Sequence, residues 1–350
     1  MKTVSVDASQ KYDVIVGKGV LFQLGEYIMG CCGNCSAVII SDSNVFPLYG
    51  ATVMENLLQS GITSHSFVIP AGEASKNLQT YSDILNFLAE KHITRSDVIV
   101  ALGGGVVGDL AGFTAATYLR GISFVQIPTS LLAMVDSSVG GKTAVDLSVG
   151  KNLVGAFKQP KFVLCDVDVL DTLPQEFLID GCAEVIKYAM LYDIELFRYL
   201  QNEGLKFDRE TVISKCVSHK ASVVHQDEFD TGLRQLLNLG HTIGHAVEIN
   251  SGFSVSHGRA VAIGMAIVTK AAVKKGICDK ATLNALLQIL KVFSLPFTTT
   301  IACSALSTSV LSDKKRTGEY INLILPCSIG NCKICPTPVS ELESFIKAGL

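Results

Sequence analysis

The sequence predicts an α/β protein with a Rossmann-like parallel sheet in its first half and a mainly α-helical second half. Short apolar runs alternate with helical stretches up to about residue 173, and strand signals nearly disappear beyond that point. Such alternation is typical of a parallel sheet covered by helices on both faces. We therefore expect two domains, an α/β domain at residues 1–173 and a mainly helical domain at residues 174–350.

The individual elements follow from the same patterns. Each expected strand of the first half is an apolar run bounded by turn residues or charge, and the five runs are residues 37–41, 66–70, 98–102, 124–128 and 162–166. Between the second and third strands a helix is expected at residues 77–91. In the second half, helical periodicity covers residues 180–192, 208–226, 233–249, 257–275 and 280–292, and one strand is expected at residues 320–325.

Composition excludes several classes of protein. The 350 residues are 48% hydrophobic and 17% charged, which is typical of a compact globular protein rather than a disordered one. A net charge of −3 gives no general attraction to nucleic acid or to an anionic membrane. No apolar run reaches the ~20 residues that span a bilayer. We expect a cytoplasmic protein with neither of those partners.

The chain contains eleven cysteines, an odd number, and no secretory signal precedes them. One alternative is a tetrathiolate zinc site built from Cys32, Cys35, Cys332 and Cys335. Reduced thiols that act as small apolar side chains are the favoured interpretation.

A glycine-rich turn links the third expected strand to a helix. In VIVALGGGVVGD, residues 98–109, Gly103, Gly105 and Gly108 match G-x-G-x-x-G in the strand-to-helix context that this motif needs. Glycines let the backbone approach a diphosphate, and the helix start offers free N–H groups. The acidic residue that usually follows about 20 positions later is missing. Asp42, after an earlier strand, is a candidate for that role, and PAGEASK at residues 70–76 forms a second candidate loop.

Histidines and one carboxylate form a candidate metal site. His241 and His245 are four residues apart, which places them on one helix face, and His257 follows sixteen residues after His241. Glu184 lies in GCAEVIKY. Two histidines and one carboxylate are a known set of ligands for an open zinc site. The spacing does not choose between His241 and His245. The alternative is a pair of histidines without a metal, either on the polar surface or buried with satisfied hydrogen bonds.

Basic and polar residues suggest an anionic ligand. GGKTAVDLSVGKN, residues 140–152, is interpreted as a flexible, glycine-rich segment whose lysines suit phosphate or carboxylate. Asp136 stands among apolar neighbours, where a carboxylate needs a partner. Further cationic or polar candidates in the second half are Lys220, Arg234, Asn238, Lys314 and Lys315.

Taken together, these segments resemble the 3-dehydroquinate synthase family over residues 42–315. The resemblance is most specific in GGGVVGDLAGFTAATYLRG (residues 103–121), in IPTSLLAMVDSSVGGKTAVDLSVGKNLVGAFKQP (127–160), in AEVIKY (183–188) and in GLRQLLNLGHTIGHAVE (232–248). It implies a phosphate-eliminating carbon–oxygen lyase of the shikimate pathway, which supplies aromatic amino acids. The implied reaction converts 3-deoxy-D-arabino-heptulosonate 7-phosphate to 3-dehydroquinate and phosphate, by transient oxidation with NAD+, phosphate elimination, re-reduction and aldol ring closure.

The resemblance also implies ligands for each group. The metal, Zn2+ or Co2+, is expected on Glu184, His241 and His257. NAD+ is expected on Asp42, Glu73, Lys76, Gly104, Gly105, Asp109, Thr129, Ser130 and Thr172, with Asp136, Lys142 and Lys151 shared with the substrate. The substrate is expected on Asn152, Lys187, Lys220, Arg234, Asn238, His245, Lys314 and Lys315, of which Lys187, Lys220, Arg234, Asn238 and His245, together with Lys142, form the implied catalytic set.

Arg120 matches a family arginine that reaches the substrate phosphate in the neighbouring subunit, which implies a homodimer. Two features depart from the family pattern. Arg259 replaces a glutamate two residues after His257, and the tail CSIGNCKICPTP, residues 327–338, is unlike the usual ending. The competing interpretations are another sugar phosphate cyclase, a metal-dependent NAD polyol or glycerol dehydrogenase, and a non-catalytic NAD-binding regulator.

Overall fold

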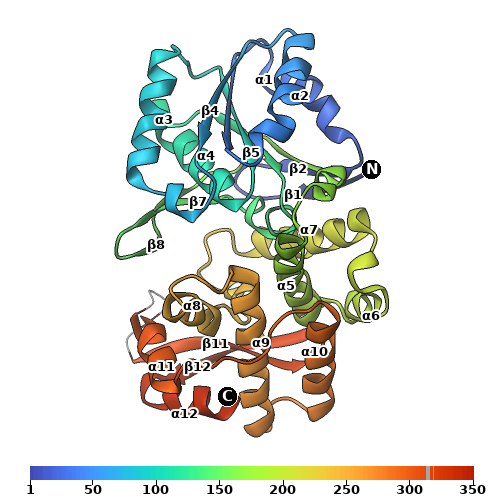
Figure 1. Ribbon diagram of the computed structural model, residues 1–350, viewed down its shortest axis with the longest axis vertical. Helices are drawn as coiled ribbons and strands as arrows, with labels where there is room; N and C mark the ends of the chain where they lie inside the picture. Colours follow the sequence, from blue (N-terminus) through green and yellow to red (C-terminus); the bar gives the residue numbers. More distant parts are fainter. Residues whose placement is uncertain (313–315, 318) are drawn as a thin grey trace. The chain divides into compact units, whose positions relative to one another are not determined.

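The computed structural model describes residues 1–312, 316–317 and 319–350 (Figure 1). The chain forms two compact units. The first contains Met1–Pro174 and Arg209–Phe229, and the second contains Gln175–Asp208 and Asp230–Leu350. None of the helices in the described ranges has the length and apolar character needed to cross a membrane.

A seven-stranded sheet forms the centre of the first unit. Its strands lie in the order β1-β2-β9-β6-β5-β3-β4, and all neighbours run parallel except β1 and β2. The five predicted strands are confirmed; β1 and β2, whose charged and polar residues interrupt the apolar pattern, were not expected. The bounds are β1 (Lys2–Val6), β2 (Tyr12–Gly17), β3 (Ala37–Asp42), β4 (Ser64–Ile69), β5 (Val98–Gly103), β6 (Ser123–Pro128) and β9 (Phe162–Asp166).

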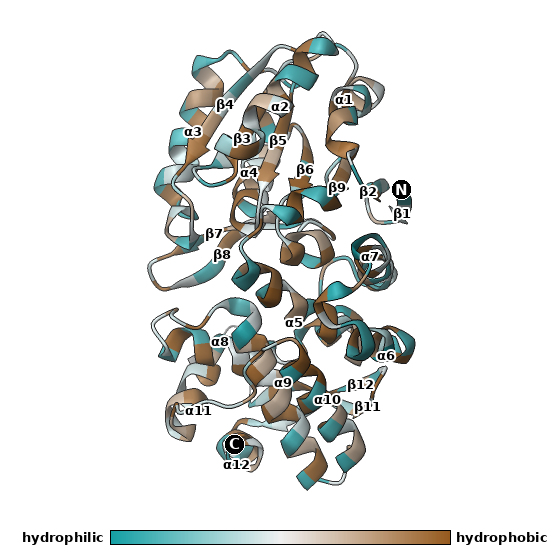
Figure 2. Ribbon diagram, turned by 45° about the vertical axis from the view of Figure 1, so that its right-hand side comes forward, coloured by the Kyte–Doolittle hydropathy of each residue, from teal (hydrophilic) through white to brown (hydrophobic). Residues whose placement is uncertain are grey.

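Helices cover both faces of this sheet, as the sequence predicts. Along β3, Ile39 packs with helices α1 (Leu24–Cys32) and α2 (Phe46–Gln59), whereas Val38 and Ile40 pack with α3 (Leu78–Glu90) and α4 (Gly105–Thr117). Successive side chains of a strand point to opposite faces, so a strand buried on both sides is apolar throughout. Figure 2 shows this hydrophobic colouring along the central strands.

The strand order reverses between β3 and β5. From β5 the chain proceeds through β6 to β9, and β4 lies on the other side of β3. In open parallel sheets, ligands bind outside the carboxyl ends of the strands at such a reversal. Asp42 ends β3 and Gly103 ends β5, so the predicted nucleotide residues lie at this position.

Two features of the first unit differ from expectation. Residues 142–157 form an antiparallel hairpin of β7 (Lys142–Leu147) and β8 (Gly150–Phe157) rather than a flexible segment, because Thr143, Ala144 and Val145 are buried and β7 packs on α4. Helix α7 (Arg209–Gln226) also belongs here, although it lies beyond residue 173. It packs against β1, where Glu210 binds the N-terminal ammonium group at 3.0 Å.

Helix α9 is the central element of the second unit. It is buried along most of its length and packs against α5, α8, α12 and strand β11. The helix predicted at residues 233–249 is interrupted, because Gly240 adopts a φ of 78° between a short 3-10 turn at Leu233–Asn238 and α8. The other predicted helices are confirmed. The helices are α5 (Gln175–Tyr192), α6 (Ile194–Glu203), α8 (His241–Asn250), α9 (His257–Lys274), α10 (Lys280–Val292), α11 (Cys303–Ser312) and α12 (Leu342–Gly349). The strands are β10 (Arg316–Thr317), β11 (Tyr320–Ser328) and β12 (Asn331–Pro338), in one antiparallel sheet.

Candidate active site

Close packing of α5, α8 and α9 brings Glu184, His241 and His257 together. A Cβ atom on Gly240 would lie 2.6 Å from the Val261 carbonyl oxygen, and one on Gly264 would lie 2.0 Å from the Gly240 carbonyl oxygen. Side chains at these positions would therefore force α8 and α9 apart. With glycine there, the ring centroids of His241 and His257 lie 5.2 Å apart.

Glu184 lies at the centre of this cluster and is completely buried. Its Oε1 atom is 3.3 Å from His241 Nε2 and 3.4 Å from His257 Nε2, and its Oε2 atom is 2.5 Å from Lys187 Nζ. Among the described residues, no donor makes a hydrogen bond of good geometry to either oxygen. A buried carboxylate without such donors is costly. A divalent cation among these ligand atoms would remove that cost, so the residues fit the metal that the sequence implies.

The other nitrogen of each imidazole is held by a second partner. His241 Nδ1 lies 3.1 Å from the Leu239 carbonyl oxygen, and His257 Nδ1 lies 3.3 Å from Glu248 Oε2. Such partners fix the ring orientation and leave Nε2 for the metal, as in most histidine-bound zinc sites. Glu248 was missed as a functional residue. Its spacing of seven from His241, two helical turns along one face, is the signal that could have found it.

Burial and the neighbouring charges set the protonation of the cluster in the absence of a metal. Burial lowers the pKa of His241 to about 4, which favours the neutral imidazole that a metal requires. Burial also opposes a charge on His257, but its contacts with Glu184 and Glu248 outweigh burial and raise its pKa to about 10. Burial raises the pKa of Glu184, yet Lys187 and His241 outweigh it and hold the pKa well below its usual range. Glu184 is thus an anion beside one neutral and one cationic imidazole, and a metal that binds here would have to displace the proton of His257.

A second, overlapping group of possible ligands exists. In the described part of the chain, ligand atoms lie within 4.8 Å of one another in two groups of residues. One group is Glu184, His241 and His257, and the other is His245, Glu248 and His257. The His245 ring lies 5.6 Å from that of His241 and 5.9 Å from that of His257. The group around Glu184 is the more buried of the two. The choice of Glu184, His241 and His257 stays a prediction.

Asp180 fixes the start of α9, next to His257. Its carboxylate accepts hydrogen bonds from the Ser256 hydroxyl and, at 3.0 Å, from the Arg259 backbone N–H. This contact uses only the backbone of Arg259, and the Arg259 side chain makes no ion pair with any described residue. The second partner of His257 is Glu248, so the arginine at position 259 does not remove it.

Replacing Glu248 with glutamine should weaken metal binding without abolishing it. The amide keeps the size of the side chain but loses the charge that holds His257 Nδ1. Partners of this kind typically contribute about 10- to 100-fold in metal affinity. We expect the dissociation constant for Zn2+, measured by competition with a chromophoric chelator, to rise by about that factor. An unchanged constant would contradict the role given to Glu248.

In the first unit, the glycine turn lies directly before α4 and includes its first residue. The first intrahelical bond of α4 runs from Gly108 N to Gly104 O, so the preceding N–H groups have no helical partner. A Cβ on Gly105 would lie 3.1 Å from Ser137 Oγ, and one on Gly104 would lie 3.6 Å from Ser130 Oγ. Side chains would therefore fill this cradle, and the glycines fit an approaching diphosphate. Thr129 lies alongside, with its N–H bonded to the Gly103 carbonyl at 3.0 Å.

Lys76 organises a polar cluster beside this turn. Its Nζ atom lies 2.6 Å from Asp109 Oδ2 and donates to Asn152 Oδ1 at 2.5 Å. Glu73 lies 4.0 Å from Lys76 Nζ and 3.8 Å from Lys151 Nζ. Burial disfavours the charge on Lys76, but Asp109 and Glu73 outweigh burial and raise its pKa. Five of the predicted residues, from three separate segments of the chain, therefore share one network.

Asp136 finds the partner that its apolar surroundings require. Lys220 on α7 donates from Nζ to the Asp136 carbonyl oxygen at 2.7 Å and to its Oδ1 at 2.6 Å. This contact places Lys220 in the first unit, with the predicted nucleotide residues. Both residues were predicted from the sequence, but nothing in the sequence indicated that they pair.

The remaining predicted residues occupy separate places. Asp42 Oδ1 accepts from the N–H groups of Asn44 and Val45, and Thr172 Oγ1 lies 2.5 Å from the Tyr49 hydroxyl. Lys142 is exposed at the start of β7, and Arg120 is exposed in a turn after α4. In the second unit, Arg234 is buried in the turn that also carries Asn238. Lys314 and Lys315 lie outside the described residues.

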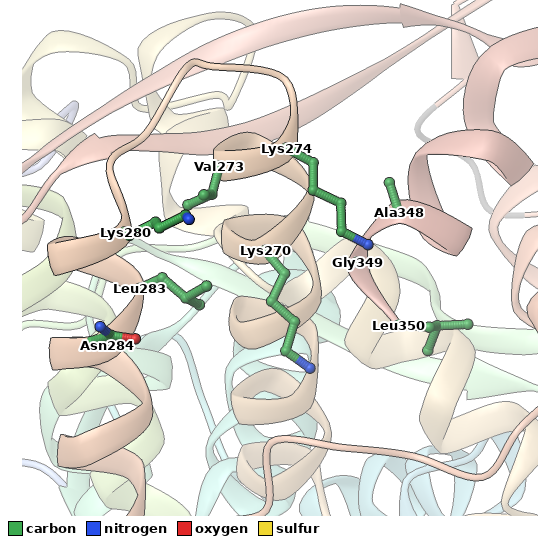
Figure 3. Close-up of a pocket in the computed structure, with 9 residues that line it drawn as sticks. All are labelled: Lys270, Val273, Lys274, Lys280, Leu283, Asn284, Ala348, Gly349 and Leu350. Carbon is green, nitrogen blue, oxygen red and sulfur yellow. The ribbon is translucent and has the colours of Figure 1, made fainter.

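A surface pocket of about 300 Å³ lies elsewhere in the second unit, between α9, α10 and the end of α12. Figure 3 shows Lys270 and Lys274 extending from successive turns of α9, with Lys280 across from them. None of the residues predicted to hold metal, cofactor or substrate lines this pocket. Its position gives it no part in the proposed chemistry.

Two sequence profiles match adjacent parts of the chain. The 3-dehydroquinate synthase N-terminal profile matches residues 66–180, and the 3-dehydroquinate synthase C-terminal profile matches residues 181–316. A 3-dehydroquinate synthase from Clostridium acetobutylicum is 45% identical over 99% of this chain and 99% of its own length. One from Enterococcus faecalis is 42% identical over 99% of this chain and 98% of its own length.

Solved structures agree at lower identity. A 2-deoxy-scyllo-inosose synthase complexed with carbaglucose-6-phosphate, NAD+ and Co2+ superposes with a TM-score of 0.90, at 25% identity and full coverage of both chains. A 2-epi-5-epi-valiolone synthase from Streptomyces hygroscopicus, with NAD+ and Zn2+ bound, gives 0.88 at 27% identity, over 99% of this chain and 98% of that one. These neighbours confirm the fold class. On the full-length matches above, the chain belongs to the 3-dehydroquinate synthase family.

Proposed function

We propose that this chain converts 3-deoxy-D-arabino-heptulosonate 7-phosphate to 3-dehydroquinate and inorganic phosphate, with NAD+ and a divalent metal, Zn2+ or Co2+, as cofactors. The observation that carries the proposal is the buried Glu184–His241–His257 cluster, in a chain that is 45% identical to a 3-dehydroquinate synthase over its whole length. When bound, NAD+ would take up and return a hydride, and the metal would polarise the hydroxyl oxygen on the carbon that gives up that hydride.

The nucleotide is proposed to lie over the Gly104–Gly105 cradle. The diphosphate is proposed to bind the free N–H groups at the start of α4, and Asp42, at the end of the neighbouring strand, is proposed to bind the ribose. Glu73, Asp109, Thr129, Ser130 and Thr172 are proposed to complete the set. The experiment for this assignment is NAD+ binding to the Gly105→Val variant, which we expect to be lost.

The substrate is proposed to be oriented by cations. Lys142, Lys151 and Asn152 come from one hairpin, and Lys76 fixes Asn152 by its hydrogen bond. Lys187, next to Glu184, and Lys220, next to Asp136, are held in place by their ion pairs. Arg234, Asn238, His245, Lys314 and Lys315 are proposed as further substrate ligands. Ammonium and guanidinium groups bind phosphate at one end of the substrate and carboxylate at the other.

Proton transfers need little from the chain in this scheme. The departing phosphate can accept the proton that its elimination releases, so the residues serve mainly to hold the substrate in a reactive conformation. The overall reaction has no net oxidation, because the hydride removed is returned. This distinguishes the proposed function from that of a dehydrogenase.

The test follows product and cofactor together. The purified protein is incubated with the heptulosonate phosphate, NAD+ and Zn2+, and we expect phosphate and a six-membered carbocycle in equal amounts with no build-up of NADH. Chelation of the metal is expected to stop phosphate release while NAD+ still binds. Stoichiometric NADH would identify a dehydrogenase instead. Turnover of glucose 6-phosphate but not of the heptulosonate would identify another sugar phosphate cyclase, the type of enzyme among the structural neighbours.

Replacing Lys142 with alanine should lower kcat by about 100-fold, the scale of a lost orienting contact. Lys142 is exposed at the start of β7, so the truncation leaves the core intact and the melting temperature should stay unchanged. Lys91, an exposed lysine at the end of α3, provides a matched control whose alanine variant should keep full activity. Normal turnover by the Lys142 variant would refute the assignment.

We further propose that the chain acts as a homodimer in the cytoplasm. Arg120 and its neighbour Leu119 both have positive φ, 67° and 50°, a strained backbone of the kind found at functional sites. This fits an arginine presented to the substrate of a second subunit. All eleven cysteines are free thiols, as expected in a reducing compartment. Mixing inactive Arg120→Ala and Lys142→Ala chains should restore activity to some mixed dimers, and no recovery would argue against sharing of Arg120.

A further inference from the structure

Two adjacent thiols lie at the end of α1. Cys31 is exposed, Cys32 is half-buried, and their Sγ atoms lie 3.5 Å apart. The end of a helix disfavours negative charge, so a thiolate here needs other support. The hydrogen bond from Cys31 lowers the pKa of Cys32 to about 7, against burial, and Ser123 and Lys161 act in the same direction. The thiolate, which is the reactive form, is therefore well populated near neutral pH.

A cationic pocket adjoins these supporting residues. It has a volume of about 170 Å³, and its lining includes Ser123, Lys161, Lys158 and Arg95 but no acidic residue. In the described part of the chain, none of the three cations forms an ion pair. Burial and the charge of Lys161 lower the pKa of Lys158. Cations held this close without an acid favour an anionic ligand.

One residue of the pocket lining carries an acceptor that is enclosed within the protein. Gln159 belongs to its lining and is 5% exposed. Its Oε1 atom is buried and has no hydrogen-bond partner among the described residues, whereas its Nε2 atom donates to Glu228 at 2.9 Å. A buried acceptor of this kind calls for a donor. This oxygen has almost no accessible surface, so the ligand is defined by the cations of the lining, with which carboxylates would pair.

Ser123 and Lys161 belong both to the surroundings of Cys32 and to the pocket lining. We propose that Cys32 is a site of S-thiolation by small acidic disulfides, whose carboxylates bind Arg95, Lys158 and Lys161 while a sulfur atom meets Cys32. The ligand class is a low-molecular-weight peptide thiol in its oxidised form. This site uses none of the residues assigned to metal, cofactor or substrate.

The chemical step is thiol–disulfide exchange. The Cys32 thiolate attacks one sulfur of the disulfide, a new S–S bond forms, and the old one breaks. The second half of the disulfide leaves with the electron pair and takes a proton from water, so Cys32 is oxidised and the departing thiol is reduced. Cys31 does not displace the adduct, because adjacent Cα atoms lie about 3.8 Å apart and a relaxed disulfide needs at least about 4.4 Å.

The test compares three disulfides on the reduced full-length chain. Oxidised glutathione is acidic, bis(2-hydroxyethyl) disulfide is neutral and cystamine is cationic, and each rate is divided by the rate of the same disulfide with a small free thiol. We expect one adduct per chain, on the Cys32 peptide and reversed by dithiothreitol. Oxidised glutathione should react about tenfold faster than the neutral disulfide, the lower end of electrostatic enhancement, and cystamine should be slowest.

Variants separate the thiol from the pocket. Cys32→Ser should abolish the adduct, and Lys158→Gln should remove the preference for the acidic disulfide while leaving the neutral rate unchanged. Lys161→Gln should lower both rates, because Lys161 also acts on Cys32. Cys303→Ser, at another half-exposed thiol, is the matched control and should behave like the parent chain. Equal normalised rates for the three disulfides, an adduct on a different cysteine, or a Cys31–Cys32 disulfide in its place would each overturn the proposal.

Discussion

Replacing His241 with asparagine is expected to empty the metal site, while the same change at His245 is expected to leave the metal bound. His241 Nε2 faces Glu184 Oε1 at 3.3 Å, and its Nδ1 atom is held by the Leu239 carbonyl. Asparagine can still bond to that carbonyl but has no atom in the place of Nε2. Loss of a direct ligand should weaken metal binding by more than the roughly 100-fold that is the upper range for loss of a residue that holds a ligand in place.

Metal content and turnover are both measured, because together they distinguish loss of the metal from loss of a substrate contact. The metal content of the purified variants is measured by mass spectrometry, with apo protein titrated to obtain the dissociation constant. Turnover should fall on the order of 1,000-fold in the His241 variant, about 4 kcal/mol of barrier. The His245 variant should also lose activity, since His245 is proposed to touch the substrate, but with its metal intact.

His257 belongs to both possible ligand groups, so the His257→Asn variant should lose the metal whichever group is correct. It serves as the positive control for the measurement. Metal loss from the His245 variant together with retention in the His241 variant would move the site to His245, Glu248 and His257. Glu184 would then be left as a buried partner of Lys187.

The parallel sheet was predictable because its strands are buried on both faces. Residues 98–102 form a continuous apolar run that follows a charged residue and precedes a glycine-rich turn. Such a run has few interpretations other than a buried strand. Strands β1 and β2 carry Lys2, Ser5 and Asp13 within their apolar pattern, which hides them. The hairpin at 142–157 was misjudged because Gly140 and Gly141 before it and Gly150 at its turn suggest flexibility, whereas packing of β7 on α4 decides the outcome.

The candidate site was predictable in its residue types but not in its pairings. Spacing placed His241 and His245 on one helix face and could not choose between them, because the choice depends on which ring α9 and α5 approach. Lys220 and Asp136 lie 84 residues apart and meet only through the packing of α7 in the first unit. Pairings of this kind depend on tertiary contacts that no local pattern encodes.

Replacing Gly258 with alanine should both destabilise the second unit and weaken its metal site. A Cβ atom at this position would lie 1.9 Å from the Asp180 carbonyl oxygen, which belongs to the backbone of α5 and cannot swing away. The start of α9 would have to move away from α5, and His257, the residue before Gly258, would move with it. Overpacking of this kind typically costs about 1–3 kcal/mol.

The comparison that isolates this effect is Gly30→Ala. Gly30 is a glycine in helix α1, and a Cβ atom added to it would have no atom within 4 Å apart from its chain neighbours and the nearby helix backbone. Alanine there should therefore add about 0.5–1 kcal/mol of stability through helix propensity. Denaturant unfolding with and without Zn2+ measures both the stability of the metal-free protein and the stability that the metal adds. In the parent chain, Zn2+ should raise the free energy of unfolding, and in the Gly258→Ala variant that increment should shrink, because a metal stabilises only as far as its ligands converge. If the increment is unchanged while stability falls, α9 relaxes without carrying His257 away from Glu184, and the α5–α9 contact then sets the stability of the unit but not the geometry of its ligands.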